Sequence, residues 1–209
     1  MTESTAASRR HFDRWARVYE RDWASRWLAG LQQQALESLE LSPGDRLLDV
    51  GCGTGAAVRR AAPLVERAVG VDLSPRMIAR ARELGGGLPG VEFLEADAES
   101  LPFADGTFTA LLCTTSFHHY PNAQRAVHEM ARVLAPGGRV AIADGSSDGV
   151  PGRVLDAVLR RMQRGHVGFR RSGEIAEMFG REGLSVAATR HLIGGSYMIV
   201  VARRPATRG

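Results

Sequence analysis

A short apolar run that ends in an acid and leads into three alternating glycines constrains this chain more than any other feature. The run covers residues 46–50, and the glycines are Gly51, Gly53 and Gly55. An apolar run of this length is typical of a buried strand, and the next residues, 56–65, predict a helix. Glycine permits positive φ and removes Cβ where the backbone turns sharply. The unit therefore predicts a ligand that lies on the backbone at the carboxyl end of a strand.

Two classes of ligand use such a turn. The dinucleotide pattern G-x-G-x-x-G/A is satisfied by Gly51, Gly53 and Ala56, so the turn alone leaves a nicotinamide dinucleotide (NAD) open. Asp49, two residues before the first glycine, shifts the balance, because an acid at this edge repels a pyrophosphate and suits an ammonium group. The additional Gly55 also favours a ligand with an ammonium group over a dinucleotide.

Apolar runs and helical patterns alternate along the rest of the chain, which predicts a parallel sheet built from strand–helix–strand units. The expected strands are 46–50, 67–72, 91–95, 108–113, 138–144, 184–190 and 196–203, and the expected helices are 56–65, 75–84, 122–134, 151–163 and 172–181. Only residues 193–195 join the last two strands, so this pair must be antiparallel. The predicted fold is α/β, with a seven-stranded, doubly wound, mostly parallel sheet that closes with an antiparallel hairpin.

Five segments at regular positions carry a resemblance to a known family. They are 47–55, 69–77, 95–98, 101–103 and 134–138. The first closely resembles motif I of the class I methyltransferases that use S-adenosylmethionine (SAM). Together the segments resemble the ubiquinone/menaquinone-biosynthesis-type methyltransferases (methyltransferase type 11) over about residues 45–145. The resemblance implies the Rossmann-like methyltransferase fold, with SAM as the cofactor.

Two acids after the second and third strands are expected to hold the nucleoside. Asp72, about 20 residues past the turn, can accept both ribose hydroxyls, a contact that NAD would also use. The resemblance implies that Asp97 meets the adenine amino group and that Leu73, Met77 and Ala98 supply apolar walls. The full set of residues expected to bind the cofactor is Tyr19, Asp49, Gly51, Cys52, Gly53, Gly55, Asp72, Leu73, Met77, Asp97, Ala98 and Thr114.

Two histidines after the fourth strand are the candidate catalytic groups. His118 and His119 should lie at the carboxyl edge of the sheet, and Asp144 ends the neighbouring fifth strand. A general base is needed only for an acceptor that arrives protonated, such as a phenol or a carbon acid. The hypothesis is that His118 is a base assisted by Asp144; the alternative is that the histidines only shape the loop.

The remaining segments suggest one domain over residues 1–209. Residues 1–41 form a helical N-terminal extension, 45–145 the SAM-binding core, and 145–171 a candidate substrate-side segment. In the extension Trp15, Tyr19, Trp23 and Trp27 recur every fourth residue, which predicts an aromatic stripe that docks on the core or closes the pocket as a lid.

Composition excludes several kinds of chemistry. All 27 basic residues are arginine, so a P-loop lysine, a pyridoxal phosphate Schiff base and a lysine nucleophile are excluded. Cys52 and Cys113 are the only cysteines, without metal-ligand spacing, and are expected to be buried thiols with no metal site. The absence of a long apolar run or a signal peptide predicts a cytoplasmic protein without a membrane span.

The predicted function is SAM-dependent methylation of a small organic acceptor. A quinone-type ring or a specialised metabolite is favoured, with O- or C-methylation ahead of N-methylation. The arginines are mixed with acids despite a net charge of +4, and the motifs of cytosine and adenine methyltransferases are absent, which argues against nucleic acid. An NAD-binding oxidoreductase, a non-catalytic SAM-binding partner subunit, RNA methylation and a homodimer all stay open from the sequence.

Overall fold

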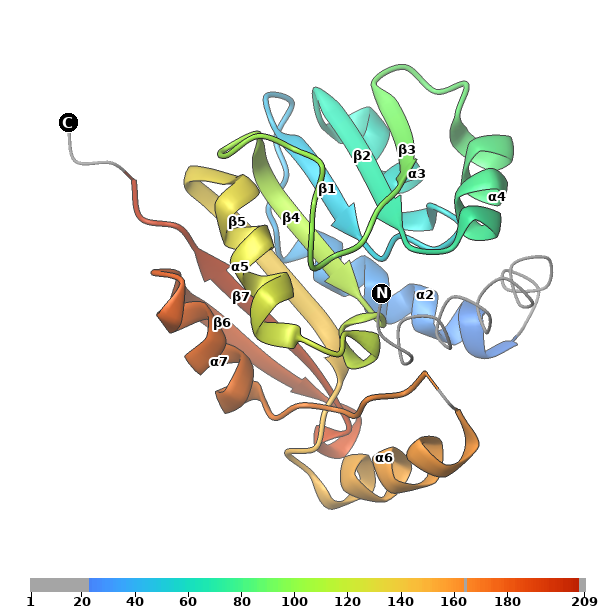
Figure 1. The fold of residues 1–209 in the computed structure, drawn as a ribbon, viewed down its shortest axis with the longest axis vertical. Helices are drawn as coiled ribbons and strands as arrows, with labels where there is room; N and C mark the ends of the chain where they lie inside the picture. Colours follow the sequence, from blue (N-terminus) through green and yellow to red (C-terminus); the bar gives the residue numbers. More distant parts are fainter. Residues whose placement is uncertain (1–22, 164, 207–209) are drawn as a thin grey trace.

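A seven-stranded sheet forms the centre of the computed structural model, which describes residues 23–163 and 165–206 (Figure 1). The strand order is β3-β2-β1-β4-β5-β7-β6. Its strands are β1 (Arg46–Val50), β2 (Arg67–Asp72), β3 (Val91–Glu95), β4 (Phe108–Thr114), β5 (Leu134–Gly145), β6 (Ser185–Leu192) and β7 (Tyr197–Arg203). The first five strands pair in parallel, and β7 runs antiparallel to both β5 and β6. The predicted fold and its closing hairpin are confirmed.

Helices cover both faces of the sheet (Figure 1). They are α2 (Trp23–Glu37), α3 (Ala56–Ala61), α4 (Pro75–Gly85), α5 (Ala123–Val133), α6 (Val150–Met162) and α7 (Ser172–Arg181), with single 3-10 turns η2 (Ala62–Leu64), η3 (Phe117–His119) and η4 (Ile193–Gly195). Buried side chains place α2, α3 and α4 on one face and α5 and α7 on the other. No helix in the described part of the chain has the length and hydrophobicity to cross a membrane.

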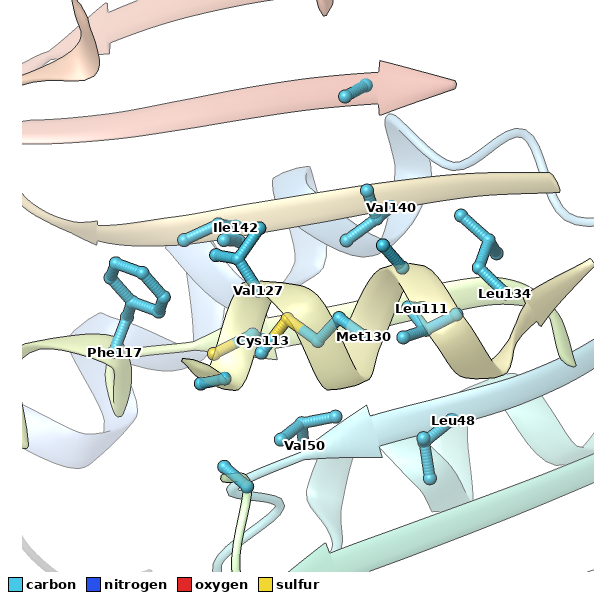
Figure 2. Close-up of a cluster of buried hydrophobic side chains, with 14 of the residues drawn as sticks. Leu48, Val50, Leu111, Cys113, Phe117, Val127, Met130, Leu134, Val140 and Ile142 are labelled. Carbon is cyan, nitrogen blue, oxygen red and sulfur yellow. The ribbon is translucent and has the colours of Figure 1, made fainter. Parts of the chain in front are cut away.

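The largest part of the core lies between α5 and the sheet (Figure 2). Val127 and Met130 of α5 contact this layer, and Leu48, Leu111 and Val140 come from three neighbouring strands. All five side chains are at most 1% exposed. Burial of a large aliphatic side chain contributes about 1.5–3 kcal/mol, so this layer fixes the order of the central strands.

Local signals explain why most helices begin where the sequence predicts. Ser74 caps α4 by accepting a hydrogen bond from the Met77 N–H at 3.2 Å, and Pro75 occupies the first turn. Asn122 caps α5 in the same way through the Arg125 N–H. These caps satisfy backbone donors that a helix leaves free at its start.

Two predicted boundaries are wrong. The helix predicted over 56–65 ends at Ala61, because Pro63 has no N–H and the chain continues as the 3-10 turn η2. The fifth strand begins at Leu134, four residues before the predicted 138. Leu134 pairs with Phe108 across a register irregularity, and the Gly137 N–H donates to the Arg204 carbonyl, so the expected loop is an irregular part of the central strand β5.

A buried ion pair holds the amino end of β1. Asp45 is 4% exposed, and its carboxylate oxygens lie 2.6 and 3.0 Å from the Arg139 guanidinium. The Thr109 hydroxyl and the Ser42 N–H also donate to Asp45, at 2.7 Å each. Burial opposes ionisation of Asp45, but these hydrogen bonds outweigh it and hold the pKa of the carboxyl well below its ordinary value. The pair joins β1, β4 and β5 at one point.

We expect Asp45→Asn to lower the free energy of unfolding at pH 7 by about 3–5 kcal/mol, because it leaves a largely buried guanidinium without its counter-charge. Because the native pKa of Asp45 is lowered, its ionised carboxylate stabilises the fold at pH values above the ordinary pKa near 3.8. This stabilisation is lost as pH falls below that value, so the difference in stability between variant and wild type should shrink there. Urea unfolding at several pH values measures this. The control is Glu92→Gln at the exposed Arg67–Glu92 pair, which should cost under about 1 kcal/mol.

Candidate active site

The glycine turn after β1 adopts the left-handed backbone that the sequence predicts. Gly51, Gly53 and Gly55 have φ values of 77°, 55° and 79°. The N–H groups of Gly51 and Cys52 both donate to the Val71 carbonyl, at 2.8 and 2.9 Å. A Cβ on Gly51 would lie 2.3 Å from the hydroxyl oxygen of Ser116. The turn is therefore closely packed as well as conformationally restricted.

A pocket of about 310 Å³ lies against this turn, at the carboxyl ends of the parallel strands. Its lining includes nine of the twelve residues expected to bind the cofactor: Gly51, Cys52, Gly53, Asp72, Leu73, Met77, Asp97, Ala98 and Thr114. Asp49 and Gly55 are not part of the lining. Tyr19 lies outside the described residues, as do the side chains of Trp15, Trp23 and Trp27. The structure thus brings together three of the five segments that carry the resemblance, 47–55, 69–77 and 95–98, whereas 101–103 and 134–138 lie outside the lining.

Asp49 is buried behind the pocket wall without compensation. Its side chain is 0% exposed, and neither carboxylate oxygen has a hydrogen-bond partner in the described part of the chain. Burial, reinforced by the nearby charge of Asp72, raises the pKa of Asp49 to about 7. A cation placed in the pocket would favour the ionised form, so Asp49 suits a ligand that carries an ammonium group.

The two acids expected at the nucleoside are held by backbone donors. Asp72 accepts the Gly53 N–H at 2.9 Å through one oxygen and the Ser74 N–H at 2.8 Å through the other. Asp97 accepts the Glu99 N–H at 2.9 Å. A carboxylate oxygen can accept more than one hydrogen bond, so side chains of this kind suit the hydroxyl and amino donors of a ligand in the pocket.

Helix α2, in the extension that the sequence expects to dock on the core or close the pocket, supplies one wall of the pocket through residues that the sequence analysis did not select. Leu28, Ala29 and Gln32 line the pocket. Gln32 donates from Nε2 to the Thr114 hydroxyl at 3.1 Å, and its Oε1 accepts from Arg60 at 2.8 Å. Gln32 thereby ties α2 to both β4 and α3. The partners lie 82 and 28 positions away along the chain, so no local pattern could reveal this contact.

The turn η3 carries both candidate histidines. Nδ1 of His118 lies 2.7 Å from Oδ1 of Asp144, and the His118 N–H donates to Oδ2 at 2.8 Å. Nδ1 of His119 lies 2.7 Å from the Gly165 carbonyl. The two rings are in contact, tilted by 46° with centroids 4.0 Å apart. The structure thus pairs His118 with Asp144 as expected, yet the pocket lining contains His119 and neither member of that pair.

A second buried acid–histidine pair, also missed from the sequence, lies against the first. Oδ1 of Asp156 on α6 lies 2.7 Å from Nε2 of His166 and accepts the Phe169 N–H at 2.7 Å. Burial opposes its ionisation, but these hydrogen bonds and one from Arg160 hold the pKa of Asp156 below its ordinary value. Burial also lowers the pKa of His166. The His118 and His166 rings are 5.0 Å apart, so the segment after α6 packs onto the histidine turn.

Both cysteines are buried thiols, as predicted. Burial raises the pKa of Cys113 to about 12 and that of Cys52 well above its ordinary value, so both stay protonated. The described residues contain no cluster of three or more side chains that could hold a metal ion.

Comparisons with known proteins agree with this geometry. Residues 48–142 match the family model of a methyltransferase domain. The chain is 29% identical over 202 residues to a demethylmenaquinone methyltransferase of Desulfitobacterium hafniense, covering 84% of this chain and 80% of that protein. It is 38% identical over 139 residues to a 2-phytyl-1,4-naphtoquinone methyltransferase of Thermosynechococcus vestitus, covering 64% and 62%.

A solved structure supports the fold. The crystal structure of the YcgJ protein from Bacillus subtilis matches with a TM-score of 0.76 at 22% identity, over 85% of this chain and 99% of that chain. The chain spans between 40% and 80% of the lengths of the first five curated relatives. These comparisons support SAM, and not NAD, as the cofactor.

The residues present fit this cofactor. The glycine turn gives its methionine part access to the backbone, and the uncompensated carboxylate of Asp49 suits its ammonium group. Asp72 and Asp97 offer acceptors for the ribose hydroxyls and the adenine amino group, beside the apolar side chains of Leu73 and Met77.

We expect the affinity for S-adenosylhomocysteine, the product, to fall about tenfold between pH 8 and pH 6, because protonation of Asp49 near pH 7 removes the charge that attracts the ammonium group. Calorimetric titration measures this, and Asp49→Asn should bind weakly at both pH values. Because the native pKa of Asp49 is raised, the folded state loses stability relative to the unfolded state as pH rises from about 4 to 7. The ligand-free Asp49→Asn variant should therefore have a higher melting temperature than wild type at pH 8. An unchanged pH profile in the variant would contradict the assignment.

The glycine turn allows folding and binding to be separated. Gly55→Ala would place Cβ 2.5 Å from the Phe93 ring at a φ of 79°, and should cost at least about 2 kcal/mol of stability. Gly53→Ala meets nothing within 4 Å, so it should cost only about 1–2 kcal/mol for its positive φ. Because Gly53 lines the pocket, its variant should nevertheless lose most affinity for S-adenosylhomocysteine. Urea unfolding and calorimetry distinguish the two effects.

Proposed function

We propose that this chain, which belongs to the class I S-adenosylmethionine-dependent methyltransferases of the type 11 family, methylates a small aromatic acceptor with an acidic hydroxyl, such as a reduced quinone. The observation that carries the proposal is the array in which His119 lines the cofactor pocket, with His118 and Asp144 packed behind it. Such an array serves an acceptor that must lose a proton before it can accept a methyl group.

The chemistry explains why a base indicates this class of acceptor. SAM supplies a methyl group that is already activated on a sulfonium. The protein must therefore align the acceptor and exclude water, and alignment can contribute about 7–11 kcal/mol. A hydroquinone hydroxyl is largely protonated at neutral pH. Removal of its proton makes both the oxygen and the adjacent ring carbon nucleophilic. O- and C-methylation thus follow from the same proton transfer.

The two histidines have different parts in this proposal. His119 lines the pocket, and donation from its Nδ1 to the Gly165 carbonyl makes Nε2 the nitrogen that can accept a proton. His118 is fixed twice by Asp144, through its ring and its backbone N–H, and its ring packs against that of His119. We assign proton removal to His119 and positioning of the turn to His118 and Asp144. This refines the sequence hypothesis, which gave the base role to His118.

The named relatives support the acceptor class. Two of them are a demethylmenaquinone and a 2-phytyl-1,4-naphtoquinone methyltransferase, and both names describe methyl transfer to a quinone ring. A specialised metabolite with a phenolic hydroxyl would use the same groups. Reduced naphthoquinones with and without an isoprenoid side chain are therefore the first acceptors to test.

We expect His119→Gln to lower kcat by about 10²-fold, with little change in S-adenosylhomocysteine affinity, because the variant keeps the shape of the site but cannot take the proton. Asp144→Asn should lower kcat less and flatten the dependence of kcat on pH. Steady-state kinetics with the reduced naphthoquinone measure both. Equal turnover by the His119→Gln and His118→Gln variants and the wild type would show that the reaction needs no base.

The prior control is binding of the cofactor itself. Wild type should bind S-adenosylhomocysteine in the micromolar range, Asp72→Ala should lose this binding, and NAD should not bind. If the product binds but neither reduced naphthoquinone is methylated, the proposed acceptor class is wrong, and the alternative of a non-catalytic SAM-binding partner subunit is tested next.

A further inference from the structure

Helix α6 presents its apolar side outward. Val150, Val154, Val158 and Met162 follow one another at intervals of four residues and are 63%, 60%, 44% and 76% exposed. Leu155 lies beside them and is 45% exposed. In a globular protein an aliphatic stripe at this spacing normally faces the core. Figure 1 shows α6 away from both helix layers, beyond the carboxyl end of β5.

The opposite side of α6 fixes this orientation. Its only buried residues are Gly152 and Asp156. A Cβ on Gly152 would lie 1.8 Å from the Ser146 carbonyl oxygen, so the helix backbone rests directly on the loop after β5. Asp156 accepts hydrogen bonds from His166 and from the Phe169 backbone, both at 2.7 Å. Rotation of the helix to bury its stripe would break these bonds and leave a buried histidine without its partner.

The exposed part of α6 carries positive charge alone. Arg153, Arg160 and Arg161 are exposed, while the only acid of the helix, Asp156, is buried. Arg160 donates to Asp156 at 2.8 Å, which leaves Arg153 and Arg161 as the charges beside the stripe. Aliphatic side chains next to arginines, with no exposed acid, are typical of a helix that lies in the surface of an anionic membrane.

We propose that α6 docks on an anionic lipid surface, with its aliphatic stripe in the boundary between headgroups and acyl chains and its arginines among the headgroups. Charge complementarity favours lipid over a second copy of the chain, because a two-fold interface through α6 would set the same arginines against one another without an acid to pair them. The attraction of one arginine to an anionic surface contributes about 1 kcal/mol.

The docking surface is connected to the active site. The segment after α6 donates the Val167 N–H to the His118 carbonyl at 2.9 Å, and its Gly165 carbonyl lies 2.7 Å from Nδ1 of His119. A lipid-soluble acceptor would thus leave the membrane beside the histidine turn. This consequence rests on the proposed function, whereas the docking itself does not and can be measured without any acceptor.

The test is co-sedimentation of the full-length protein with vesicles. We expect binding to phosphatidylcholine vesicles that contain about 30% phosphatidylglycerol, weaker binding to phosphatidylcholine alone, and a loss of binding as salt rises. The double variant Val154→Glu/Val158→Glu should bind at least about tenfold more weakly. The matched control, Leu88→Glu/Val186→Glu, changes two aliphatics of similar exposure elsewhere, at 41% and 40%, and should bind like wild type.

Arg153→Gln/Arg161→Gln should reduce the preference for anionic vesicles and keep the weak binding to neutral ones. Melting temperature and S-adenosylhomocysteine affinity verify that every variant is folded. Absence of vesicle binding by wild type at low salt would overturn the proposal, as would equal losses in the α6 and control variants. A dimer in analytical ultracentrifugation that Val154→Glu/Val158→Glu dissociates, without vesicle binding, would show instead that α6 is an interface between copies.

Discussion

The buried carboxylate of Asp49, which has no hydrogen-bond partner in the described part of the chain, is the constraint that governs what the pocket at the carboxyl ends of the strands can bind. Two buried acids at opposite ends of β1 have opposite environments. Asp45 at its amino end has an arginine, a hydroxyl and a backbone donor, whereas Asp49 near its carboxyl end has no hydrogen-bond partner in the described part of the chain. The first acid stabilises the fold, and the second holds a charge whose cost is offset when a cationic ligand enters the pocket. The acid that stabilises the fold and the acid that suits the ligand thus lie at opposite ends of one strand.

Most of the fold could be predicted from the sequence because its signals are local. The bounds of β1, β2 and β3 follow from apolar runs between turn residues, and Ser74 marks the start of α4 through a cap that spans three residues. The start of β5 could not be predicted in this way. Residues 135–137 look like a loop because of Pro136 and Gly137, but they belong to β5, and the Gly137 N–H donates to the Arg204 carbonyl, far away in the chain.

The site was predictable where topology brings strand ends together. His118 follows β4 and Asp144 lies near the end of β5, and these strands are neighbours in the sheet, so their contact could be expected from the order of the elements. Gln32 and the Asp156–His166 pair have no such guide, because helix rotation and the course of a connecting segment decide their contacts. The same dependence on distant contacts explains why the sequence hypothesis gave the base role to His118. The sequence placed both histidines at the correct edge but could not show which ring reaches the pocket.

Helix α6 shows how a single buried polar group can override a hydrophobic pattern. Its four-residue spacing predicts a stripe that faces the core, and full burial of one such side chain would contribute about 1.5–3 kcal/mol. The helix instead turns Asp156 inward, where it satisfies His166 and the Phe169 backbone beside the histidine turn. Rotation of the helix would leave His166 without its acceptor and break the close approach of Gly152 to the Ser146 carbonyl, so these contacts together set the orientation. Holding the segment after α6 in place therefore leaves the aliphatic stripe in water. A lipid surface would offset this cost by removing the same side chains from water.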